Sequence, residues 1–236
     1  MSGRNYWHEN DPRWTAVDEY AFSHLHPSSK TPSASALEDA LAASEKEGLP
    51  DIAVSPSQGK YLQLQARLVR AKNILEVGTL GGYSTIWLAN ASPNVHVTSV
   101  EVDKHHAKVA RANVKNAGVA DRIDLRLGPG IDVLPQLAEE VKAGKRGKFQ
   151  LVFIDADKEN NWNYVDIALG MCEPGACIIV DNVVRRGRLA QDLDDPSVMG
   201  ARKVVENVGK DDRLDGIVMQ TVGEKSYDGF LIAVVK

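Results

Sequence analysis

The chain has 236 residues and a formal net charge of −4, which suits one α/β domain with a full hydrophobic core. A weakly acidic chain with scattered positive charges argues against a nucleic-acid-binding protein. No apolar run reaches membrane-spanning length and the N-terminus is polar, so we expect a cytoplasmic protein without a membrane segment or a secretory signal.

The N-terminal stretch predicts helices that precede the main domain. Apolar residues recur at helical spacing between Trp14 and Leu25, and an alanine-rich stretch spans 34–47. On this basis we divide the chain into a helical segment over 1–52 and a main domain over 53–236. The two helices could cover the sheet, close over the active site or form a contact between two copies of the chain.

A third helix is expected after the segment Val-Ser-Pro-Ser-Gln-Gly-Lys-Tyr-Leu, which begins at Val54. Ser57 is its expected N-cap, and the helix should run to about Ala71. Val54 immediately precedes this helix, and we expect it to lie close to a ligand bound at the glycine turn described next.

A strand, a glycine-rich turn, a helix and a second strand are predicted between Asn73 and Glu101. Ile74 to Val77 is a short apolar run, which is typical of a buried strand, and Val95 to Val100 is a second β-branched run. The glycines between them are Gly78, Gly81 and Gly82. Such a turn is tight or approaches a ligand closely, and the order of elements is that of a nucleotide-binding half of a doubly wound sheet.

Two acids favour one cofactor class at this turn. Dinucleotide folds usually show G-x-G-x-x-G around a pyrophosphate, whereas the spacing here is G-x-x-G-G and Glu76 stands before the first glycine. A carboxylate there would repel a pyrophosphate but suit an ammonium or sulfonium group. Glu101 could accept hydrogen bonds from a ribose diol. Both acids fit S-adenosylmethionine; a turn that binds nothing is the alternative.

The next stretch predicts a charged helix, a strand and another helix. His105 and His106 should face solvent on the first helix. Gly130, at the start of the second helix, can approach an adenine ring. The basic run 142–148 should be a solvated surface loop.

Acidic side chains end two further predicted strands. Asp155 ends the apolar run from Phe149 and is followed by Asp157 and Lys158; Asp181 and Asn182 end the next one. Ligands bind at this edge of open α/β sheets, and three oxygen donors would suit Mg²⁺ or another divalent cation. Acids that merely cap the following helices are the alternative.

The sequence resembles the metal-dependent O-methyltransferases of the catechol and caffeoyl-coenzyme A type, above all their microbial members. The matching segments are 55–62, 75–84, 153–158, 180–182 and 226–230. The resemblance implies a Rossmann-like seven-stranded sheet with an antiparallel last strand. Thr221-Val222 and 230–235 would form its final hairpin, with Asp228-Gly229 in or beside the turn.

The resemblance also implies roles for individual residues. It implies S-adenosylmethionine contacts at Val54, Glu76, Gly78, Thr79, Ser84, Glu101, Gly130 and Asp157. It implies metal ligands at Asp155, Asp181 and Asn182, a catalytic base at Lys158 and a substrate contact at Tyr164. A homodimer is a further implication.

One loop departs from the plant coenzyme A-thioester members. They carry an aromatic residue where this chain has Arg185, which is followed by Arg186 and Arg188. These arginines could meet an anionic acceptor group, or they could be solvated loop charges.

The expected function is therefore methyl transfer to a hydroxyl of a catechol-like phenolic small molecule, assisted by a divalent metal. Two alternatives stay open at this level. One is an NAD-type oxidoreductase on the same fold, and the other is a non-catalytic S-adenosylmethionine-binding protein.

Overall fold

Aliphatic runs form the centre of the sheet, because strands of a parallel sheet are covered on both faces. The computed structural model describes residues 11–191 and 193–236, and within them seven strands form one sheet in the order β3-β2-β1-β4-β5-β7-β6. The strands are β1 (Asn73–Val77), β2 (His96–Glu101), β3 (Ile123–Leu127), β4 (Phe149–Ile154), β5 (Cys172–Val180), β6 (Leu214–Thr221) and β7 (Asp228–Val235). The predicted doubly wound sheet is confirmed, with β7 antiparallel to both of its neighbours.

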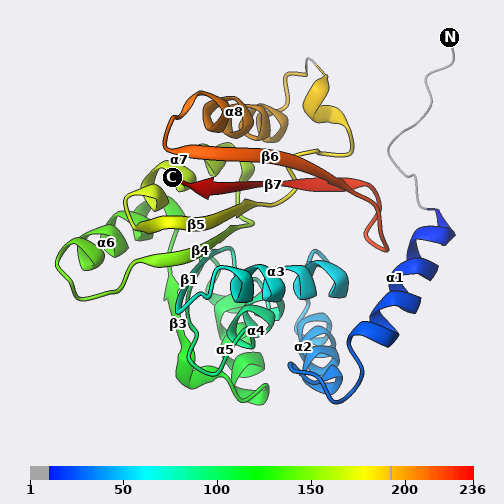
Figure 1. Ribbon diagram of the computed structural model, residues 1–236. Coiled ribbons are helices and arrows are strands. Elements are labelled where there is room, and N and C mark those ends of the chain that lie inside the picture. The colour runs from blue at the N-terminus through cyan, green and yellow to red at the C-terminus, as the bar shows by residue number, and fades with distance from the viewer. Residues whose placement is uncertain (1–10, 192) are drawn as a thin grey trace, which may run out of the picture.

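Helices cover both faces of the sheet (Figure 1). One layer consists of α3 (Pro56–Leu68), α4 (Tyr83–Ala89) and α5 (Lys104–Asn116). The other consists of α6 (Gly130–Lys142), α7 (Asn161–Leu169) and α8 (Pro196–Lys210). Each layer packs its apolar side chains against the sheet, so the core consists of two clusters separated by the strands.

The two N-terminal helices form as predicted but pack differently. Helix α2 (Ala34–Lys46) buries Leu37 and Ala40 and contacts α5, whereas α1 (Pro12–Leu25) buries none of its residues. Figure 1 shows α1 beside α3, at the margin of the molecule. The part of the chain that the structure describes contains no helix long and apolar enough to cross a membrane.

The predicted start of the third helix was wrong by two residues. Ser55 is the N-cap and accepts a hydrogen bond from Gln58 N, because Pro56 lacks an N–H and fits the first helical position. Ser57 therefore lies inside the helix, and its hydroxyl donates to Asp18 on α1 at 3.0 Å. The helix ends at Leu68 rather than near Ala71.

The final hairpin is longer than predicted. β6 begins at Leu214, and Asp228 and Gly229 lie beside the turn, as the first residues of β7. β6 has only one buried residue, so its sequence lacks the apolar run that marks the central strands. Gly229 is required by packing, since a Cβ there would lie 2.1 Å from the carbonyl oxygen of Met219.

Two histidines make contacts of note. His105 is exposed as predicted, and its ring Nε2 lies 2.8 Å from the carbonyl oxygen of Glu47. His26, at the end of α1, is buried against Trp87, with 4.8 Å between the ring centroids, and its burial lowers its pKa. The ring of His26 therefore contributes to the core beneath α1.

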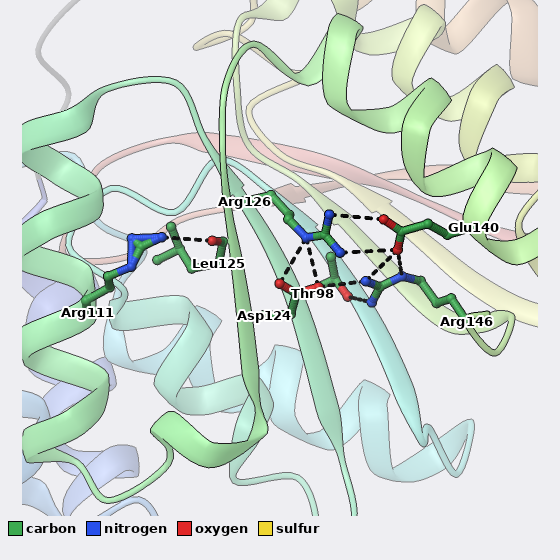
Figure 2. A network of polar contacts seen from close by, with 7 residues as sticks. All are labelled: Thr98, Arg111, Asp124, Leu125, Arg126, Glu140 and Arg146. Atoms are coloured by element: carbon green, nitrogen blue, oxygen red, sulfur yellow. Dashed lines mark hydrogen bonds and ion pairs between the residues drawn. The ribbon is translucent and has the colours of Figure 1, made fainter.

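The basic run 142–148 is not wholly solvated. Figure 2 shows Arg146 joined to Asp124 and Glu140, with Arg126 bridging the same two carboxylates. Arg146 Nη2 lies 2.6 Å from Asp124 and 2.8 Å from Glu140. Burial opposes ionisation of both acids, but the hydrogen bonds from the two arginines outweigh it and lower both pKa values. The network ties the edge strand β3 to α6.

Arg111, on α5, also contacts the edge strand β3. Its guanidinium donates to the carbonyl oxygen of Leu125 on β3 at 3.0 Å (Figure 2). Carbonyl groups of an edge strand otherwise offer a template for pairing with another chain. The interaction therefore shields part of the free edge of the sheet.

A buried polar cluster joins β1, β2 and α4. The fully buried Glu76 accepts hydrogen bonds from the hydroxyls of Ser84, Thr85 and Ser99. Burial raises the pKa of Glu76 to about 7, although the three hydroxyls oppose the rise. The cluster fixes α4 directly behind the glycine turn.

Replacing Glu76 by Gln should make the stability of the protein less dependent on pH. The pKa of Glu76 rises from 4.5 to about 7 on folding, so between these values the unfolded chain releases a proton that the folded chain keeps. The wild type then loses about 3 kcal/mol of unfolding free energy as pH rises through this range, and the variant does not.

Urea denaturation of both proteins at about pH 5 and about pH 8 measures the effect. Glu139→Gln, on the exposed face of α6, is the matched control. A Glu76→Gln effect of the same size at both pH values would contradict the prediction.

Candidate active site

The carboxyl ends of the central strands lie at one level. The backbone pairing continues one residue beyond each strand, because Asp155 N donates to Val77 O at 2.8 Å and Asp181 N donates to Ile154 O at 2.9 Å. Gly78, Asp155 and Asp181 are therefore neighbours across β1, β4 and β5. This is the edge at which the sequence placed the candidate residues.

Two cavities open along this edge in the part of the chain that the structure describes. The large cavity has a volume of about 1150 Å³ and the small cavity about 620 Å³. Both are lined by residues 51–54, Asn182 and Lys225. The predicted site residues in the large cavity are Val54, Gly78, Thr79, Ser84, Glu101, Gly130, Asp155, Asp157, Lys158, Tyr164 and Asn182. Asp181 lines the small cavity.

Glu76 does not line either cavity. Its carboxylate is occupied by the three hydroxyls of the buried cluster, so it reaches the large cavity only through Ser84, which donates to it at 2.6 Å and does line the cavity. The expectation that this carboxylate would itself face a cationic ligand has no counterpart in this geometry. Sequence spacing gives the position of an acid but not its depth.

The glycine turn packs directly on the end of β4. Gly78 has φ +99°, and a Cβ there would lie 2.1 Å from the carbonyl oxygen of Asp155. At Gly81, a Cβ would lie 2.1 Å from the hydroxyl of Ser44 on α2. The turn thus leaves no room for side chains on the protein side, and its backbone forms the floor of the large cavity.

Glu101 holds the glycine turn in place. Its carboxylate accepts hydrogen bonds from Thr79 N at 3.1 Å, Leu80 N at 2.7 Å and Asp103 N at 2.9 Å. Leu80 has φ 50°, a left-handed conformation that is costly for a residue with a Cβ. The acid therefore both stabilises a strained turn and presents a charged edge to the cavity.

His106 is a cavity residue that the sequence analysis assigned to solvent. It lies one turn into α5, lines the large cavity, and its Nδ1 lies 3.7 Å from Glu101. The sequence could not reveal that His106 lines a cavity, because a histidine near the start of a helix can equally be exposed. Gln58 was similarly missed as a site residue: its side chain is hydrogen-bonded to Asp181.

Tyr164 and Asp157 form the far side of the large cavity. The tyrosine is 2% exposed and its hydroxyl donates to Asp157 at 2.5 Å. Burial and the negative charge of Asp157 raise the pKa of Tyr164. Gly130 fits against this ring, since a Cβ there would lie 2.9 Å from it. Tyr164 thus lies in the large cavity rather than in the small one.

Lys158 and Asp155 meet where the large cavity approaches the small one. Lys158 Nζ lies 2.7 Å from Asp155 Oδ1, and the lysine side chain is 12% exposed. Lys158 begins a short 3-10 turn (Lys158–Asn160), which packs against Gly200 on α8 so closely that a Cβ there would lie 2.1 Å from the Lys158 carbonyl oxygen. The packing fixes the backbone from which the ammonium group extends.

Asp181 and Asn182 bring two more oxygen donors to this place. Burial and then the negative charge of Asp155 raise the pKa of Asp181, with Lys158 acting in the opposite direction. Asn182 has φ 54°, a left-handed conformation that asparagine tolerates. Two carboxylates close enough to disfavour each other's charge, beside an amide, are a donor set that a divalent cation would stabilise.

This donor set contains only two carboxylates. Among residues 11–191 and 193–236, no three His, Cys, Asp or Glu side chains gather as a metal-binding group. Amide oxygens are nevertheless ordinary ligands of hard cations.

The free cysteines Cys172 and Cys177 both lie buried in β5, where burial raises their pKa values to about 12 and about 11.

The small cavity combines apolar and charged walls. Tyr61 and Phe230 line it and contact each other with tilted rings, 4.9 Å between the ring centroids. Lys225 pairs with Asp51 across the boundary between the cavities, with Nζ 2.6 Å from Oδ1. The same cavity is lined by Arg185, Arg186 and Arg188, so these predicted loop charges border a cavity.

Known proteins are similar to this chain in both sequence and fold. A family model described as O-methyltransferase matches residues 27–233. The O-methyltransferase imqG of Aspergillus flavus is 49% identical over 232 residues, covering 97% of this chain and 94% of that protein. The catechol O-methyltransferase of Mycobacterium tuberculosis is 48% identical over 202 residues, covering 85% of this chain and 89% of that protein.

One similar solved structure contains a bound ligand. The O-methyltransferase of Bacillus cereus, in complex with SAH, superposes with a TM-score of 0.87 at 44% identity, covering 95% of this chain and 99% of that one. These matches decide against the oxidoreductase and the non-catalytic alternatives. The chain therefore belongs to the O-methyltransferase family and is an S-adenosylmethionine-dependent O-methyltransferase.

Proposed function

We propose that the protein transfers the methyl group of S-adenosylmethionine to one hydroxyl of a vicinal diol on a catechol-like phenolic small molecule. One observation carries the proposal. Lys158 and Asp155 form an ion pair in the large cavity, and Asn182 lines both this cavity and the small one. Two relatives, the catechol O-methyltransferases of Mycobacterium tuberculosis and Niastella koreensis, support this acceptor class.

The large cavity is proposed to bind S-adenosylmethionine. Its wall offers Ser84 and the backbone of the glycine turn, with Val54, Gly78 and Thr79. Glu101 would accept hydrogen bonds from the ribose diol, and Gly130 and Asp157, with Tyr164 behind them, would line the adenine end. The resemblance gave Tyr164 a substrate contact, and its position supports the cofactor side instead. Glu76 would act from below, by orienting the Ser84 hydroxyl.

Asp155, Asp181 and Asn182 would hold a divalent cation. Such a cation, when bound, supplies positive charge that lowers the pKa of an acceptor hydroxyl and fixes its position. Asp155 and Asp181 repel each other in the chain by itself, and this repulsion would favour the cation. The fit rests on the chemistry of the donors, two carboxylates and one amide.

Lys158 is the proposed general base. In its unprotonated form, Nζ takes the proton of the attacking hydroxyl, and Asp155 orients the side chain through the 2.7 Å contact. The acceptor oxygen forms a bond to the methyl carbon while the carbon–sulfur bond breaks, and its electrons return to sulfur. The products are the methyl ether and neutral S-adenosylhomocysteine, so the charge of the sulfonium is balanced by the proton that the lysine takes.

The division of the chain and its assembly are also proposed. We assign residues 1–52 to a segment that covers the site and contacts a second copy, and 53–236 to the methyltransferase domain. Val17, Tyr20 and Leu25 on α1 are 66%, 70% and 69% exposed, which supports a homodimer.

Lys158→Met should lower kcat by about 100-fold or more, because it removes the base while keeping a side chain of similar length. The dissociation constant for S-adenosylmethionine should stay within about twofold, measured by isothermal titration. Lys203→Met, at an exposed position on α8, is the matched control. An unchanged kcat in the Lys158 variant would remove this residue from the mechanism.

Asp181→Asn should weaken binding of Mn²⁺ by about 10-fold or more, because it removes one of two charged donors. Electron paramagnetic resonance on the protein with S-adenosylhomocysteine measures free Mn²⁺ directly. Asp166→Asn, on the exposed part of α7, is the control. Full methyl transfer after chelator treatment, or equal Mn²⁺ affinity in both proteins, would overturn the metal proposal.

Tyr20→Glu should convert a dimer into monomers, because it places a charge in the proposed contact on α1. Sedimentation velocity of the two proteins measures this. Ala112→Glu, at an exposed position on α5, should leave the dimer intact. A monomeric wild type would contradict the dimer.

A further inference from the structure

The loop after β5 forms a cationic wall of the small cavity. Arg185, Arg186 and Arg188 line it within six residues of Asn182. The same cavity is lined by Ile52, which is 67% exposed, and by Val222, which is 53% exposed. Apolar side chains and guanidinium groups in one cavity are a combination that suits an aromatic ring with an anionic substituent.

The backbone of this loop is held in a costly conformation. Arg185 and Arg186 have φ values of 54° and 56°, a left-handed conformation that is unfavourable for residues with a Cβ. The buried end of β7 fixes the strain: Asp228 Oδ1 accepts from Arg185 N at 2.8 Å, and Gly229 O accepts from Val183 N at 3.0 Å. Strain of this kind persists where the surroundings determine one side-chain position.

Arg185 differs from its neighbour Arg188 in what it binds. Arg188 pairs with Asp195 at 2.7 Å, whereas the guanidinium of Arg185 donates to a neutral partner, the hydroxyl of Ser197, at 3.0 Å. Its Nε is buried without a hydrogen-bond partner. Within the described ranges, no carboxylate lies at ion-pair distance from the Arg185 guanidinium. The half-buried guanidinium of Arg185 thus keeps a buried N–H donor without a partner, which an anionic acceptor group would satisfy.

The acids of the small cavity are occupied elsewhere. Asp18 accepts hydrogen bonds from Ser57 and from Glu224 N, and Asp51 pairs with Lys225. The Asp228 carboxylate accepts from two backbone N–H groups, those of Arg185 and Gly229. Asp181 belongs to the proposed metal ligands. None of these carboxylates therefore neutralises Arg185 by direct contact.

We propose that Arg185 is a specificity-determining residue that binds a carboxylate on the acceptor, and that the preferred acceptors are catechols with a carboxylate on the ring or on a short side chain. The inference rests on the proposed function, because the diol would lie at Asp181 and Asn182 while the carboxylate points to the loop that follows them. Asp228 acts as a positioning residue, through the backbone N–H of Arg185.

Binding of two acceptors that differ only in charge tests the proposal. The probes are protocatechuate and its methyl ester, titrated calorimetrically into the protein loaded with S-adenosylhomocysteine and Mg²⁺. The wild type should bind the carboxylate about 10-fold or more tightly than the ester. Arg185→Met should abolish that ratio by weakening carboxylate binding, while ester binding stays within about twofold. Arg185→Lys should retain part of the preference.

Lys203→Met is the control, since this exposed cation on α8 lines neither cavity. Its ratio should stay that of the wild type. Comparing the two ligands within each variant cancels a general loss of folded protein, and an unchanged thermal midpoint of each variant confirms folding. An equal affinity of the wild type for both probes, or a ratio that survives in Arg185→Met, would overturn the proposal.

Methyl transfer to the ester separates this proposal from the proposed function. Turnover of the ester without preference for the carboxylate leaves the function intact and removes the role of Arg185. Binding of the carboxylate through Arg185, without turnover of either probe, supports the anion site and contradicts the catechol reaction.

Discussion

The site depends on one contact between two backbones. Gly78 packs on the carbonyl of Asp155 so closely that a Cβ would lie 2.1 Å from its oxygen, and this brings the glycine turn onto the end of β4. The turn is the floor of the large cavity, and Asp155 carries the contact to Lys158. The proposed binding site of the methyl donor and the proposed base are therefore both positioned by the contact between Gly78 and Asp155. Glycine is needed there because any other residue would separate them.

The acidic residues at the carboxyl edge of the sheet differ in burial and in their hydrogen-bond partners. Glu76 is fully buried and keeps its proton to about pH 7, whereas Glu101 is ringed by backbone N–H groups at the surface of the cavity. Asp155 and Asp181 raise the cost of each other's charge, and Lys158 offsets part of it. A small cavity with cationic and apolar walls lies beside them. Each acid thus has a distinct electrostatic environment, although all lie at neighbouring strand ends.

Much of the fold followed from local patterns. The apolar runs of β1, β2, β4 and β5 are buried on both faces, so their sequences alone predict parallel strands. The glycine turn and the acids at strand ends fall at the carboxyl edge of the sheet because connections in such folds keep that edge common to all parallel strands. β6 was predicted only at its end, Thr221, because it is an edge strand with one buried residue. The Ser55 cap was misassigned because two serines flank Pro56, and only the backbone geometry distinguishes them.

The sequence by itself determined the class of fold, the residues at the sheet edge and the resemblance to the O-methyltransferase family. It could do so because strand periodicity, glycine turns and short motifs are local properties of the chain. Only the tertiary structure decided which of those side chains are accessible. Glu76 lies beneath the cavity, His106 lines it, Tyr164 lies on its far side, and Arg185 meets a neutral hydroxyl instead of a carboxylate. Depth, partner and direction depend on residues distant in sequence, and for that reason no local pattern could supply them.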